Sequence, residues 1–149
     1  MATTADDKRK HLEFIQGVIN RMASNSFLFK GWSITIIAGI SAFAAKGSSS
    51  ALMLVPIIST LLFWSVDAYY LMLERAFIAL YNDVAAKPET AIDYLMTPDK
   101  KNISKAAWAK VLFTRPILWL FYGTVLIMLI ILLLIISHVK LKVQLTDGS

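Results

Sequence analysis

The chain has no cysteine among its 149 residues, which excludes disulfide bonds and thiolate metal sites. Histidine is nearly absent as well, because only His11 and His138 occur and they are too far apart to form an HxxxH metal motif. The six glycines form neither a GxGxxG nor a GxxxxGK phosphate loop. Carboxylates are few, and none form a pair suited to acid–base catalysis. We therefore expect no metal, no cofactor and no enzymatic activity.

Charged side chains are missing from three long windows, residues 31–45, 47–66 and 116–139. The last window has 24 residues and would span about 36 Å as a helix, enough to cross a ~30 Å hydrocarbon core. Hydrophobic residues make up 57% of the chain, and the mean hydropathy is +0.62. The sequence thus predicts an all-α membrane protein with a single membrane domain.

We expect transmembrane helices over residues 27–45, 52–70 and 116–138. The first window is short, so residues 27–45 reach spanning length only if Lys30 extends its ammonium toward the headgroups. A re-entrant hairpin is the alternative for this segment. Pro56 falls in the first turns of the second helix, where a missing N–H costs little.

Basic residues are distributed unequally around these helices. Twelve of the fifteen lie in the N-terminal arm or between the second and third crossings, and only Lys46, Lys140 and Lys142 remain for the other side. The positive-inside rule then places the N-terminus in the cytoplasm and the C-terminus outside it. This distribution indicates that the net charge of +5 faces anionic lipid headgroups rather than nucleic acid.

Helical periodicity continues beyond the membrane in the first two helices. Apolar residues recur at three- and four-residue steps over residues 6–26 and over 71–86, and Lys87-Pro88 is a natural end for the second segment. We expect the two segments to pack as an antiparallel helical hairpin in the cytoplasm.

In such a hairpin, two residues at the same level have residue numbers that add to a nearly constant value. By this measure, residues of opposite charge lie at the same level. This register pairs Lys30 with Asp67 and Arg21 with Glu74. We interpret both as structural ion pairs, since an unpaired charge at the membrane border is costly. The alternative is that Asp67 relays a proton or cation.

Residues 88–115 are expected to form a cytoplasmic helical connection, with a short helix over 89–96 and an amphipathic helix over 102–115. Four residues of the second helix would contact anionic headgroups at the membrane surface: Lys105, Trp108, Lys110 and Arg115. The alternative is that this helix packs on the hairpin as part of its core.

The tail over residues 139–149 alternates apolar and polar side chains for eight positions, which is typical of a strand. A lone strand is unstable in water, so we expect a short C-terminal strand paired with the tails of adjacent copies. Disorder is the alternative.

Small residues form a stripe on the first transmembrane helix. The stripe consists of Gly31, Thr35, Ala38, Ala42 and Ala45. Such residues let helix backbones approach closely in lipid, whereas the third helix is bulky and suited to face lipid. We therefore expect a homo-oligomer with the first helix toward its axis. The alternative is that this helix packs only within its own chain.

Two stretches, KHLEFIQGVINRMASNSFLFKGW over residues 10–32 and FWSVDAYYLMLERAFIALY over 63–81, carry a resemblance. They resemble a group of small, largely uncharacterised bacterial inner-membrane proteins, and the architecture is similar to that of a family described as octameric membrane proteins. The resemblance implies a bacterial inner membrane and a ring of subunits, but no established activity.

Two functions follow as hypotheses. The first is an oligomeric pore or channel-like assembly with the first helix lining the axis, where Ser33, Thr35 and Ser41 could hydrate the passage. The second is a membrane-anchored scaffold that recruits a cytoplasmic protein through the helical hairpin.

Overall fold

The computed structural model describes residues 5–46, 52 and 54–147, and no strand occurs within those residues. The chain divides into two compact units. Unit 1 comprises Met1–Leu28 and Asp67–Thr114, and unit 2 comprises Phe29–Val66 and Arg115–Ser149. The predicted helical class is therefore confirmed.

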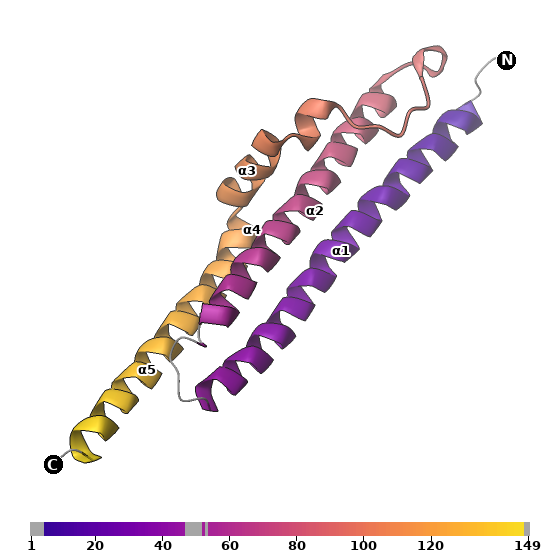
Figure 1. Cartoon of the computed structure of the whole chain (residues 1–149). Coiled ribbons are helices and arrows are strands. Elements are labelled where there is room, and N and C mark those ends of the chain that lie inside the picture. The colour runs from indigo at the N-terminus through magenta and orange to yellow at the C-terminus, as the bar shows by residue number, and fades with distance from the viewer. Residues whose placement is uncertain (1–4, 47–51, 53, 148–149) are drawn as a thin grey trace. The chain divides into compact units, whose positions relative to one another are not determined.

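Helices α1 (Ala5–Lys46) and α2 (Leu54–Ala86) are each continuous (Figure 1). The predicted segments 6–26 and 27–45 thus belong to one helix, since no proline interrupts α1. Pro56 lies in the first turn of α2, and α2 ends at Ala86 just before Lys87-Pro88, both as expected.

Three helices are long and apolar enough to cross a membrane. They cover Ala5–Phe43, Leu54–Ala86 and Pro116–Leu145, with mean hydropathies of 1.4, 1.5 and 2.8 over their most apolar windows. Their length and composition support a membrane location, as the charge-free windows predicted.

A small core holds the two helical segments of unit 1 together. Ile15 and Ile19 of α1 are buried with Val84 of α2. Partly buried residues complete this core: Leu12, Phe77, Leu80, Tyr81 and Ile92. The recurrence of these positions at three- and four-residue steps is the pattern that predicted the buried face.

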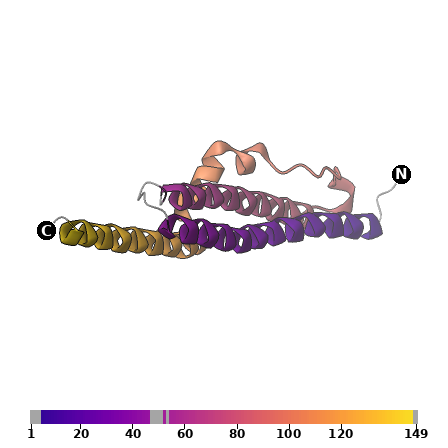
Figure 2. The ribbon, with the colours of Figure 1, turned by 60° about the horizontal axis from the view of Figure 1, so that its bottom comes forward.

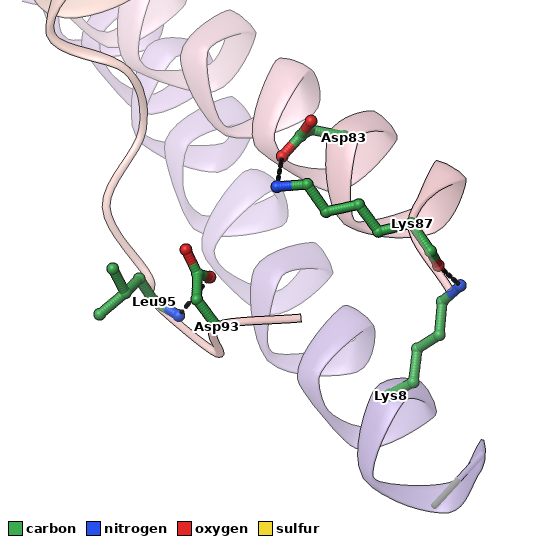
Figure 3. Close-up of polar contacts among 5 residues, drawn as sticks. All are labelled: Lys8, Asp83, Lys87, Asp93 and Leu95. Atoms are coloured by element: carbon green, nitrogen blue, oxygen red, sulfur yellow. Dashed lines mark hydrogen bonds and ion pairs between the residues drawn. The ribbon is translucent and has the colours of Figure 1, made fainter. Parts of the chain in front are cut away.

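Lys8 of α1 caps the C-terminal end of α2. Its Nζ donates to the backbone oxygens of Ala85 at 3.0 Å and Lys87 at 2.7 Å, the latter bond being drawn in Figure 3. The last carbonyls of a helix have no partner within the helix, so an ammonium at this place satisfies them and complements the helix dipole.

The predicted helix over 89–96 is wrong beyond its first turn. Only η2 (Glu89–Ala91), a single 3-10 turn, forms, and residues 92–99 have no regular structure. Asp93 accepts a hydrogen bond from the backbone N–H of Leu95 at 3.1 Å (Figure 3), which competes with helix formation. Tyr94 between them has φ 56°, a left-handed conformation that is costly for a non-glycine residue.

The amphipathic helix begins three residues later than expected. η3 (Lys100–Ile103) comes first, and then α3 (Lys105–Thr114) starts where Ser104 Oγ accepts from the backbone N–H of Ala107 at 3.1 Å. Helix α3 ends before Arg115. The backbone of Arg115 is extended, which is the conformation favoured for a residue that precedes proline. Within unit 1, η3 and α3 run beside α2 in the views of Figure 1 and Figure 2.

The C-terminal part of unit 2 is helical from Pro116 onward. It comprises α4 (Pro116–Leu118), the π-helical turn η4 (Trp119–Gly123) and α5 (Thr124–Asp147). Trp64 of α2 packs against this turn. Its ring centroid lies 4.7 Å from that of Trp119, edge-on, and 6.0 Å from that of Tyr122, stacked.

The predicted C-terminal strand is wrong, because residues 139–147 belong to α5. The last two residues of the tail, 148–149, lie outside the described residues. No glycine or proline interrupts the sequence from Thr124 to Asp147. A helix satisfies its own backbone N–H and C=O groups, whereas a strand needs a neighbour. The helix therefore forms despite the alternating pattern.

Candidate assembly face and polar sites

The predicted small-residue stripe is exposed within unit 2. Four of its residues are exposed, namely Gly31, Thr35, Ala38 and Ala42. The side chain of Ala45 lies outside the part of the chain that the structure describes. A Cβ atom built on Gly31 would meet no atom within 4 Å. Packing inside this chain therefore does not require a glycine there.

The other side of the same segment packs inside unit 2. Ser33, Ile37 and Ser41 are 0%, 4% and 8% exposed. Ser33 Oγ donates to the Lys30 backbone oxygen at 2.8 Å, and Ser41 Oγ donates to that of Ile37 at 2.6 Å. These hydroxyls are thus used within α1, while Thr35, which donates to the Gly31 oxygen at 3.2 Å, is exposed.

A groove lies between α1 and α5 in unit 2. Its volume is about 550 Å³, and its walls are almost wholly apolar. Ile34, Ile37, Ala38 and Ser41 line one side, and side chains of Val125–Ile135 line the other. A groove of this composition fits an acyl chain or another apolar helix in a bilayer.

Asp67 is fully buried at the start of its segment in unit 1. Its carboxylate accepts a hydrogen bond from the hydroxyl of Ser26, itself 6% exposed. The sequence reasoning missed Ser26, although it continues the apolar steps at Ile15, Ile19 and Met22 on α1 and lies one turn from Lys30, which the predicted register pairs with Asp67. A serine in a core stripe opposite an aspartate is the signal that could have found it.

The two predicted ion pairs remain predictions. Lys30 belongs to unit 2 and Asp67 to unit 1. Arg21 is exposed and Glu74 half-buried, both within unit 1. Arg21 also lines a groove of unit 1 that contains His11 and Tyr94.

Unit 1 carries an open groove with a volume of about 900 Å³ that the sequence did not predict. His11, 5% exposed, lies edge-on to Tyr94 with the ring centroids 5.2 Å apart, and both line the groove. Neither His11 Nε2 nor the Tyr94 hydroxyl has a hydrogen-bond partner among the described residues. Burial raises the pKa of Tyr94, and the negative charges of Asp7 and Glu89 add to the shift.

The four predicted membrane-surface residues differ in exposure. Lys105 and Lys110 of α3 are exposed, whereas Trp108 and Arg115 are half-buried. Val111 is 6% exposed, so α3 buries one apolar side chain. The helix thus packs on its own chain while both lysines are exposed, and their contact with headgroups stays a prediction.

Within the described residues, no group of three or more His, Asp or Glu side chains is placed to hold a metal ion. No family model, curated protein or solved structure matches this chain. The candidate site is the stripe on α1, because the fold leaves Gly31, Thr35, Ala38 and Ala42 exposed.

Proposed function

We propose that this protein is a homo-oligomeric membrane protein of the bacterial inner membrane, in which α1 of each copy packs against α1 of its neighbours. The observation that carries the proposal is the exposure of the stripe Gly31, Thr35, Ala38 and Ala42, with open space around the Gly31 Cα. Helices in lipid associate through small residues because these allow close backbone approach.

The orientation follows from charge. Three crossings with the basic residues mostly on one side favour an N-terminus in the cytoplasm and a C-terminus outside. Unit 1, with α3 and its exposed Lys105 and Lys110, then lies at the cytoplasmic surface, where anionic headgroups attract lysine.

A channel-like arrangement about the axis is the form of oligomer we propose to test. Thr35 is the hydroxyl that the stripe would offer to a passage, since Thr35 is exposed whereas Ser33 and Ser41 are buried. One hydroxyl per copy in an otherwise apolar lining would conduct poorly, so we expect the assembly to be easier to detect than conduction.

The test adds bulk to the stripe. Gly31→Leu and Ala38→Leu should shift the full-length protein toward monomer in mild detergent, as measured by sedimentation. The matched control is Ile36→Phe, because Ile36 is exposed on α1 but lies off the stripe. A wild-type monomer that co-purifies with another protein would instead favour the scaffold function.

A further inference from the structure

We propose that the groove of unit 1 binds α1 of a second copy of this chain, so that the contact between copies extends outside the membrane. This inference rests on the proposed oligomer and assigns it a second contact surface. The groove residues of α1 that carry the argument are Lys10, Phe14, Gly17 and Arg21.

From Gly17 onward, a small residue (glycine, serine or alanine) occurs at every seventh position of α1. Gly17, Ser24, Gly31 and Ala38 are all exposed, and Ala45 keeps the spacing in the sequence. Seven residues are close to two turns of an α-helix, and a seven-residue repeat is typical of helices that pack along their length. The repeat starts at Gly17, which lines the groove of unit 1. It therefore extends the stripe, which was proposed for the membrane-spanning part of α1, as far as this groove.

The groove shows that this surface is unoccupied within one chain. Phe14 is 69% exposed, and a Cβ atom built on Gly17 would meet nothing within 4 Å. Glycine in the interior of a helix lowers helix stability, and the fold of the single chain gives no reason for one at this position. A second helix packed against Gly17 supplies the reason, since only a small residue permits its close approach.

His11 provides a second, independent observation. It lines the same groove and is 5% exposed, yet its Nε2 has no hydrogen-bond partner among the described residues. A buried polar atom without a partner is costly, so a group from outside the chain is expected there. Parallel copies place residues of similar number at the same level, and Glu13, exposed at the groove, is the carboxylate that a neighbour would bring.

The charges of the groove favour a second copy over other occupants. Asp7 and Glu13 are acidic, and Lys10 and Arg21 are basic, so both signs are present in equal number. Such a surface is complementary to a parallel copy of itself, because Lys10 of one copy and Glu13 of the other then lie within one turn of the same level. Nucleic acid or anionic lipid would need an excess of basic residues instead.

The absence of cysteine permits a direct test in the full-length protein. Single cysteines are introduced at Gly17 or Ser24, and at the matched controls Gln16 or Ala23, which are exposed neighbours on another side of α1. Membranes are treated with a mild oxidant or a short bis-maleimide. We expect about tenfold more cross-linked dimer from Gly17→Cys and Ser24→Cys than from the controls.

Two outcomes separate this inference from the proposed function. If Gly31→Cys and Ala38→Cys cross-link but positions 17 and 24 do no better than 16 and 23, the groove contact is overturned and the oligomer stands. If none of the positions cross-links and the protein is monomeric, both are overturned.

A second measurement uses bulk in place of a cross-link. Gly17→Leu should raise the monomer fraction about tenfold over that of the control Gln16→Leu. A Cβ atom at this position meets no atom within 4 Å, and an unaltered circular dichroism spectrum verifies that the leucine variant folds. An oligomer equally stable in both variants contradicts the groove contact.

Discussion

Ser26 of α1 donates a hydrogen bond to the carboxylate of Asp67 on α2, with an oxygen–oxygen distance of 2.5 Å. The two residues are 6% and 0% exposed, so the bond lies in the interior of unit 1. A buried carboxylate is stable only with hydrogen-bond donors around it. This bond therefore links two segments of unit 1 that are 41 residues apart in sequence.

Removing the donor should destabilise the protein. We expect Ser26→Ala to lower the free energy of unfolding in detergent by about 1–3 kcal/mol, because the Asp67 carboxylate loses a buried donor. The control is Gln16→Ala, an exposed side chain of the same helix, with an expected change within about 0.5 kcal/mol. Equal unfolding curves for Ser26→Ala and wild type would contradict the proposed importance of the bond.

The core of unit 1 should be sensitive to cavity formation. Ile15 is fully buried between α1 and α2. Ile15→Ala is expected to cost about 2–5 kcal/mol and Ile15→Val about 0.5–1.5 kcal/mol, since the loss grows with the volume removed. Chemical unfolding followed by tryptophan fluorescence measures both. An equal loss of unfolding free energy in Ile15→Val and Ile15→Ala would show that Ile15 does not behave as packed core.

Lys8 should protect the end of α2. Lys8→Met removes the donor to the Ala85 and Lys87 oxygens, so the last turn of α2 should exchange its amide hydrogens faster, by a factor that corresponds to about 0.3–1 kcal/mol. Hydrogen exchange with mass spectrometry measures the peptide that covers this turn. Lys10→Met is the control, because Lys10 pairs with Asp6 on its own helix. The same acceleration in both variants would rule out a specific cap.

Asp99 should titrate below the ordinary range of a carboxyl group. The backbone N–H of Lys101 donates to it at 2.9 Å and the Lys101 ammonium lies 3.0 Å away, and together they lower the pKa of Asp99. The ionised form is therefore favoured in the folded chain. Its stabilising contribution is present above the usual carboxyl pKa of about 4 and is lost as the pH falls through the lower, folded value.

Carbon-13 NMR of labelled aspartate carboxyl groups measures this shift. Lys101→Met should move the pKa of Asp99 part of the way back, because the side-chain interaction is lost while the backbone bond, the larger cause, remains. A full return to the ordinary value, or no change at all, would contradict this division of causes.

Helix bounds were predictable where local signals are strong. Pro56, Lys87-Pro88 and Pro116 marked ends of helices correctly, because proline restricts the backbone regardless of tertiary context. The common side of the stripe on α1 was also predictable, since a three- and four-residue spacing needs only a regular helix, while its contact with other copies stays a prediction.

Other features depend on contacts that the sequence does not display. The tail over residues 139–147 alternates like a strand, but without a pairing strand the helix satisfies the backbone better. The bond between Ser26 and Asp67 and the ring contact between His11 and Tyr94 join residues 41 or more positions apart. The left-handed Tyr94 depends on the turn that Asp93 makes with Leu95, which competes with the predicted helix.

Native mass spectrometry of the wild-type protein released from mild detergent tests the central proposal most directly. The chain has a mass of 16.6 kDa. We predict one dominant species whose mass is a fixed multiple of that value and which dissociates when Gly31 or Ala38 is replaced by leucine. A dominant species of 16.6 kDa at every protein concentration would contradict assembly through α1.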